Sequence, residues 1–155
     1  MSDESKPVLV QQGELTEQIA ALLPTEIDGP WTSLIFTDRS LSTYGEDSMI
    51  VHRPDGTIDE SQSPPRQISK LVMKLRRVMY RDGTGTWLSA EWKITNHGDS
   101  ISSRADFDYD SEPEWFEPIE PTHYALDLED FPRDEANIPT WLRDRVDAAR
   151  ARSTE

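Results

Sequence analysis

Polar and apolar side chains alternate strictly from Ala105 to Asp110, and this pattern limits what the chain can fold into. Successive side chains of an extended backbone point to opposite faces, so the segment is predicted to be a strand with one apolar and one acidic side. The apolar side is formed by Ala105, Phe107 and Tyr109, and the acidic side by Asp106, Asp108 and Asp110. The apolar side can enter a core, whereas the three carboxylates require solvent or a partner.

Carboxylates continue beyond this strand into a loop interrupted by prolines. We call the whole set the acidic ridge; it comprises Asp106, Asp108, Asp110, Glu112, Glu114, Glu117 and Glu120. Like charges crowded in this way repel one another and destabilise the free protein unless a cationic group approaches them. The ridge is therefore interpreted either as a protein-binding face or as a solvated face. Trp115, which stands among these acids, is interpreted either as an interface anchor or as a residue that pins the loop to the core.

The charge balance of the chain narrows the class of partner. Its 155 residues include 30 acids and 16 bases, which gives a formal net charge of -14. Such a charge disfavours binding to nucleic acid or anionic lipid and favours a cationic protein. The length suits one core. The sequence contains no cysteine, no apolar signal core and no long apolar run, so we expect a cytoplasmic protein without disulfides or a membrane span.

Hydrophobic periodicity and turn residues predict an α+β domain. Helical spacing is found in residues 14–23, 68–79 and 140–152, and strand patterns in 31–37, 48–52, 86–95 and 101–109. The predicted order is α-β-β-α-β-β-α, with an antiparallel sheet of about four strands and helices packed on one face. Residues 1–13 are predicted to be a flexible arm and residues 14–152 a single domain, in which the proline-rich stretch 113–139 is irregular.

The predicted central helix carries bases and no acids on its polar face. These bases are Arg66, Lys70, Lys74, Arg76, Arg77 and Arg81. Because runs of charge are usually solvated, this face is predicted to lie in solvent or opposite the protein's own acids.

Two residue patterns bear on catalysis and metal binding. Asp82 followed by Glu91-Trp92-Lys93 is similar to the D…E-x-K pattern of metal-dependent nucleases, in which two carboxylates hold Mg²⁺. Glu and Lys two residues apart are also what any half-exposed strand shows. A Ca²⁺ site on the three aspartates is disfavoured, because same-face strand positions are roughly 6.7 Å apart, twice the rise per residue. No nucleotide-binding loop or metal-type histidine spacing is present, so no cofactor, metal or catalytic residue is expected.

Four motifs in the C-terminal half resemble a known family. In order they are W-L-S-A-E-W-K-I from Trp87, F-D-Y-D-S-E-P-E-W from Phe107, Y-A-L-D-L-E-D-F-P-R-D from Tyr124 and I-P-T-W-L from Ile138. Their succession is similar to the YezG-like family of small acidic bacterial immunity proteins; residues 14–81 match only in the order of elements. The resemblance implies an α+β fold and a protein that neutralises a cognate polymorphic toxin, commonly a nuclease domain, by tight binding in the cytoplasm. The family positions found here are Trp92, Phe107, Tyr109, Asp110, Pro132, Arg133 and Trp141.

Charge and resemblance lead to the same hypothesis of an antitoxin that is not an enzyme. A nuclease toxin is basic where it holds phosphates, so the acidic ridge is expected to occupy or cover that groove. The predicted toxin-binding residues are Asp106, Asp108, Asp110, Glu112, Glu114, Trp115, Glu117 and Glu120. The protein is expected to be monomeric when free and to form a 1:1 complex with the toxin. Two alternatives are an adaptor or regulatory domain for another basic protein and, less favoured, a metal-dependent nuclease.

Overall fold

Five strands form a single antiparallel sheet in the computed structural model, which describes residues 5–153. The strands are β1 (Ser33–Leu41), β2 (Tyr44–His52), β3 (Ile58–Asp59), β4 (Ser89–Asn96) and β5 (Ile101–Asp108). Their order across the sheet is β3-β2-β1-β4-β5, so the hairpins β1-β2 and β4-β5 lie side by side. The predicted α+β class and antiparallel sheet are confirmed, and the prediction of about four strands omitted only β3, which has two residues.

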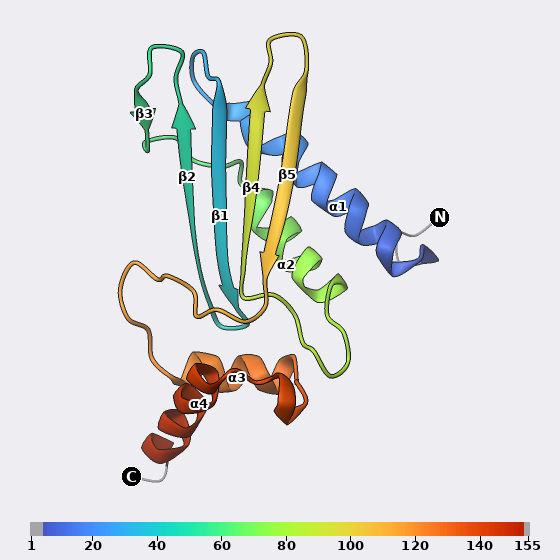
Figure 1. Ribbon diagram of the computed structural model, residues 1–155, viewed down its shortest axis with the longest axis vertical. Coiled ribbons are helices and arrows are strands. Elements are labelled where there is room, and N and C mark those ends of the chain that lie inside the picture. The colour runs from blue at the N-terminus through green and yellow to red at the C-terminus, as the bar shows by residue number, and fades with distance from the viewer. Residues whose placement is uncertain (1–4, 154–155) are drawn as a thin grey trace.

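Helices cover one face of this sheet and one of its ends. In Figure 1, α1 (Val8–Leu22) and α2 (Ile68–Val78) lie behind the sheet, while α3 (Thr122–Asp130) and α4 (Thr140–Ser153) lie beyond the strand ends. Two 3-10 helices, η2 (Leu23–Glu26) and η3 (Glu135–Asn137), are also present. Within residues 5–153, no helix combines the length and the apolar composition needed to cross a bilayer.

The structure differs from the prediction at two helices that each follow a proline: α1 begins earlier than predicted, and α3 was not predicted. α1 begins at Val8 directly after Pro7, so residues 8–13 are helical rather than part of an arm; residues 1–4 of that arm lie outside the described residues. α3 occupies nine residues of the stretch predicted to be irregular, and it follows Pro121. Proline is tolerated before the first helical turn because its missing N–H has no intrahelical partner there.

The alternation of side chains along the strands separates a buried face of the sheet from an uncovered one. The main core between the sheet and α1 and α2 includes Leu15, Ile19, Leu34, Phe36, Met49, Val51, Val72, Leu75, Trp92 and Ile94. A second, smaller core lies where α3 and α4 dock, and it contains Leu41, Leu88, Tyr124, Leu142 and Val146. We call the side of the sheet that carries no helix the open face (Figure 1).

A buried ion pair joins α2 to α3. The guanidinium of Arg76 is fully buried and donates to both carboxylate oxygens of Asp127, at 2.7 and 2.8 Å. Its Nε donates to the Trp87 carbonyl at 2.8 Å, and its plane lies over the Phe131 ring at 4.8 Å. Asp127 also accepts the backbone N–H of Ser42 at 2.9 Å, in the turn between β1 and β2. Of the two predicted surroundings of the basic face, solvent or the protein's own acids, Arg76 has the second, and it meets that acid inside the core.

We predict that Asp127→Ala lowers the free energy of unfolding by about 3 to 5 kcal/mol, because it leaves the Arg76 charge buried without a counter-ion. Urea denaturation measures this change. Glu129→Ala on the exposed side of the same helix is the matched control, with an expected change of about 0.5 kcal/mol or less. Equal effects of the two substitutions would show that the ion pair does not hold α3 in place.

The buried carboxyl of Asp38 makes the stability of the fold depend on pH. This residue lies on the buried face of β1, where burial raises the pKa of its carboxyl to about 6, against the hydrogen bond from Ser40. A raised pKa stabilises the fold while the carboxyl is protonated, and that contribution is lost as the pH rises from about 4 through about 6. Asp38→Asn should therefore gain stability relative to the unsubstituted protein between pH 4 and 7, by on the order of 3 kcal/mol.

Denaturation curves of both proteins across that pH range measure the difference. Asp55→Asn provides a control of opposite sign, because hydrogen bonds from Thr57 lower the pKa of the exposed Asp55. A stability difference for Asp38→Asn that does not change with pH would mean that Asp38 is ionised in the fold at its ordinary pKa.

Candidate functional site

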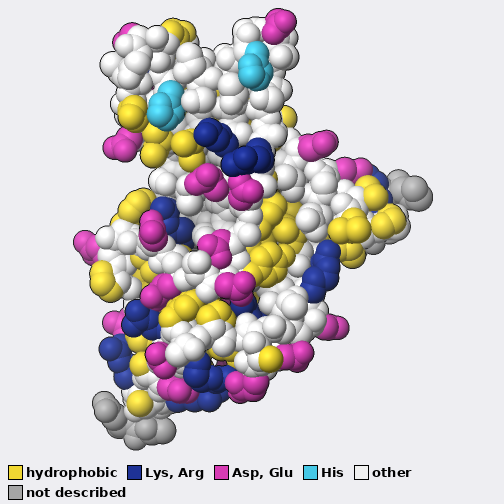
Figure 2. Space-filling model, in the orientation of Figure 1, with side chains coloured by type: hydrophobic (Ala, Val, Ile, Leu, Met, Phe, Trp, Pro, Cys, Tyr) yellow, Lys and Arg dark blue, Asp and Glu magenta, His cyan; other side chains and the backbone are white. Residues whose placement is uncertain are grey.

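The open face carries a concentration of carboxylates over β4 and β5. Pairing places Thr37, Glu91 and Asp106 in one row across β1, β4 and β5, and Ser89 and Asp108 in the next. These side chains border a depression of about 500 Å³ that continues to Asp110 at the end of β5. Figure 2 shows acidic side chains gathered over the middle of this face. We call Glu91, Asp106, Asp108 and Asp110 the acidic patch.

Glu91 and Asp106 are direct cross-strand neighbours with the same charge. Both side chains are exposed, and β4–β5 pairing places them opposite each other. Like charges in this position destabilise a sheet. Arg104 lies 3.2 Å from the Asp106 carboxylate, but both side chains are largely exposed, so this ion pair offsets little of the repulsion and is screened by salt. The next pair on the same face is Lys93 opposite Arg104, so the two acids lie beside two exposed bases.

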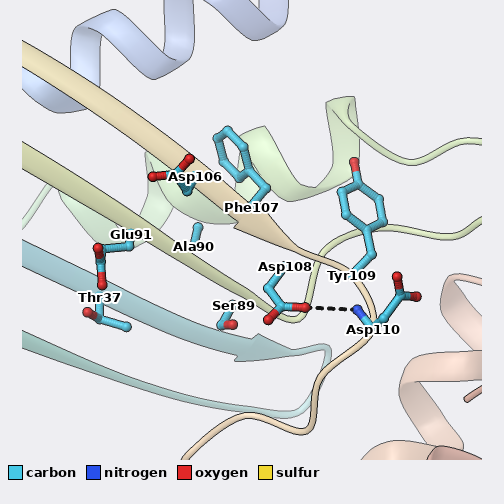
Figure 3. Close-up of a pocket in the computed structure, with 9 residues that line it drawn as sticks. All are labelled: Thr37, Ser89, Ala90, Glu91, Asp106, Phe107, Asp108, Tyr109 and Asp110. Atoms are coloured by element: carbon cyan, nitrogen blue, oxygen red, sulfur yellow. Dashed lines mark hydrogen bonds between the residues drawn. The ribbon is translucent and has the colours of Figure 1, made fainter.

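Asp108 and Asp110 shape the end of the patch (Figure 3). The Asp108 carboxylate accepts the backbone N–H groups of Asp110 at 3.0 Å and Ser111 at 2.9 Å, which turns the chain out of β5. Partial burial raises the pKa of Asp108, yet these hydrogen bonds outweigh it and the pKa is lowered, so the group stays ionised at neutral pH. Asp110 keeps an exposed carboxylate 3.6 Å from Arg133 Nη1, while its carbonyl accepts the indole N–H of Trp141 at 2.7 Å.

Two further members of the acidic ridge, Glu112 and Glu120, contact the C-terminal helices. Glu112 accepts two bonds from the Arg145 guanidinium, at 2.9 and 3.1 Å, and one from the Tyr124 hydroxyl at 2.9 Å. The hydrogen bond from Arg145 is the main reason that the pKa of Glu112 is lowered. Glu120 forms an ion pair with Arg152 in α4. These two acids therefore hold the loop to α3 and α4, whereas Glu114 and Glu117 lie exposed on the loop.

Trp115 anchors the loop through contacts within the fold, whereas the side chain of its neighbour Phe116 is exposed. The Trp115 indole N–H donates to the Tyr124 hydroxyl at 2.8 Å, and its ring meets Tyr44 edge-on at 5.3 Å. Phe116 is 67% exposed. Its backbone N–H donates to Glu46 at 2.9 Å, and the Arg39 guanidinium lies over its ring at 5.3 Å.

The structure thus brings together only part of the predicted site. Asp106, Asp108 and Asp110 lie in one patch, whereas Glu112, Trp115 and Glu120 make contacts within the fold. The sequence pattern indicated Glu91 only as a possible nuclease residue and did not place it beside Asp106. The alternation of β4 indicates the face on which Glu91 lies, but only the register of β4 on β5 shows which acid it opposes.

The pattern considered for a nuclease is not assembled. Asp82 lies in a turn whose Gly83 carbonyl accepts the Asp134 backbone N–H and the Asn137 side-chain amide, each at 2.8 Å. Glu91 lies instead on the open face. In the part of the chain that the structure describes, no group of three or more histidine or carboxylate side chains is arranged to hold a metal ion.

Several positions named above for the resemblance to the YezG-like family make contacts within the fold. Arg133 Nη2 donates to the carbonyls of Tyr109 at 2.6 Å and Thr86 at 3.1 Å. The Trp141 indole holds the next carbonyl, that of Asp110, and the buried Trp92 donates to the Thr16 carbonyl in α1 at 3.2 Å. Arg133 and Trp141 fix the end of β5 against the rest of the fold, whereas Trp92 joins β4 to α1.

We predict that Trp115→Phe lowers the free energy of unfolding by about 1 kcal/mol, because it removes the indole donor to Tyr124. Phe116→Ala should change it by about 0.5 kcal/mol or less, because that ring is mostly in solvent. Denaturation of both variants measures the two values. A larger loss for Phe116→Ala would reverse the roles assigned to these two aromatic residues.

Comparison with known proteins gave no match, either to protein-family models or among curated proteins.

Proposed function

We propose that this protein is an immunity protein, which binds and neutralises a basic toxin domain through the acidic patch. The observation that carries the proposal is the opposed pair Glu91 and Asp106, which is exposed, of like charge and bordered by a depression on a face without helices. A free protein gains no stability from this arrangement. A cationic partner relieves the repulsion and gains affinity from it.

The resemblance to the YezG-like family supports the choice of a nuclease toxin. Nucleases hold phosphates with basic side chains, so a patch of carboxylates matches the charge of such a groove. The long-range field of a protein of net charge -14 speeds the encounter with a basic partner, while close contacts at the patch slow release. Inhibition then follows from occupancy of the toxin and requires no catalytic step.

The ordered backbone around the patch suits this role. Asp108 holds its own turn, and Arg133 and Trp141 hold the two residues that follow β5. A surface that is already arranged before binding loses little conformational entropy when the partner arrives. The patch is therefore a preformed binding surface.

We predict that the double variant Glu91→Lys with Asp106→Lys binds the toxin at least about tenfold more weakly, because it places positive charge against a basic surface. Both side chains are exposed, so the fold should be retained. Asp108 is left unchanged because its carboxylate holds the turn after β5. The product of the neighbouring gene is the toxin to test, by rescue of growth on co-expression and by titration at low and high salt.

Glu17→Lys with Asp147→Lys is the matched control, because it changes the net charge equally at exposed positions on α1 and α4. It should retain rescue and most of the affinity. Equal loss in both double variants would mean that total charge, and not the patch, governs binding. Binding of the neighbouring product without rescue would favour the adaptor function over the immunity function.

A further inference from the structure

The outer edge of β2 is an incomplete sheet edge. β3 pairs with β2 only at Val51 and His52, and β2 continues for seven further residues to Tyr44. The backbone N–H of Arg53 donates to the Thr57 carbonyl across this edge, at 2.9 Å. Since backbone groups of a strand alternate between its two sides, Val51, Met49 and Asp47 direct their N–H and C=O groups to the same outer edge. β3 covers those of Val51 alone.

The backbone groups of Asp47 and Met49 have no hydrogen-bond partner on this side within residues 5–153. An exposed row of unpaired N–H and C=O groups is a template for pairing with another chain. Proteins usually protect such an edge, and strand addition to it is a common mode of peptide recognition. The edge therefore offers directional hydrogen bonds that the acidic patch lacks.

A groove runs along this part of the edge. It has a volume of about 440 Å³, and its lining includes Asp47 and Met49 of β2, Phe116, and Glu60, Gln62 and Pro64 of the segment that leads from β3 to α2. The exposed ring of Phe116 is held there by Glu46 and Arg39. Strand-binding sites combine main-chain hydrogen bonds with pockets for side chains. Here the unpaired backbone groups can form the hydrogen bonds, and the Phe116 ring can contact an apolar side chain.

The charge of the groove indicates which segment fits. The charged residues of its lining, Asp47 and Glu60, are both acidic, and the Arg39 guanidinium lies over the Phe116 ring. Partial burial raises the pKa of Asp47, against the effect of Arg39, so this carboxylate is incompletely solvated and gains from an incoming cation. Three strand spacings of about 4.8 Å, roughly 14 Å in all, separate β2 from β5. One partner of ordinary interface size can reach both the groove and the acidic patch.

We propose that an extended, basic segment of the partner pairs with the outer edge of β2 at Asp47 and Met49, with an apolar side chain against Phe116 and a cationic one beside Asp47 or Glu60. The identity of the partner rests on the function proposed above, whereas the pairing at this edge is tested separately. The depression along the other edge strand, β5, is lined by Phe107 and Tyr109, which are only partly exposed.

The probe is a synthetic nine-residue peptide in which lysine and valine alternate, added to the isotopically labelled full chain. Two-dimensional NMR should show shifted amide signals for Asp47 and Met49 and slower hydrogen exchange at both. Asp47→Pro removes one outward N–H without affecting the bonds to β1, and it should weaken binding by about tenfold. Asp47→Asn keeps the N–H and should reduce affinity less, mainly at low salt. A peptide with glutamate in place of lysine should not bind.

Phe116→Ala is a second variant that does not depend on the backbone tolerating proline, and it should also weaken binding of the peptide. Protection confined to β5, no binding of the peptide, or equal affinities of Asp47→Pro and Asp47→Asn would each overturn the proposal. The peptide experiment can fail or succeed independently of the toxin-binding experiment described under the proposed function. If the peptide pairs with the edge and the Glu91 and Asp106 double variant still binds the toxin with unchanged affinity, the patch is not the toxin-binding site, whereas strand pairing at β2 is supported.

Discussion

The position of the C-terminal helices depends on the buried pair between Arg76 and Asp127. This pair joins α2 to α3, and the same two side chains reach Trp87 before β4 and Ser42 after β1. Taking two charges out of water is unfavourable unless each has its full set of hydrogen bonds, and here both have several. Because four segments supply those bonds, the pair can form only when the sheet, α2 and α3 are all in place.

The position of α3 and α4 in turn determines which part of the acidic ridge stays exposed. Arg145 of α4 and Tyr124 of α3 bind Glu112, and Trp115 binds the same tyrosine hydroxyl. These contacts draw the loop after β5 against the helices and place Phe116 over the open face near β2. The aspartates of β5 precede this loop, so these contacts leave them on the open face.

Much of the fold could be predicted because its signals are local. Alternation and helical spacing identified the longer strands and α2, and the turn residues after β4 indicated the β4-β5 hairpin. The missed elements are those whose pattern is weak: β3 has two residues, and α3 lies between prolines. The candidate site was predicted only in part. Alternation placed Asp106 and Asp108 on one face, but the neighbouring Glu91 comes from another strand, and the roles of Trp115 and Phe116 depend on contacts with α3 and β2.

The sequence by itself determined the charge of this protein, the acidic side of β5 and the α+β class, because these follow from residue type and from periods of two and 3.6 residues. Only the tertiary structure decided which charges are neutralised inside the molecule. Arg76 meets Asp127 51 residues away, and Glu112 meets Arg145 33 residues away. Such pairs depend on strand register and helix docking, which arise from packing of the whole chain and leave no local pattern.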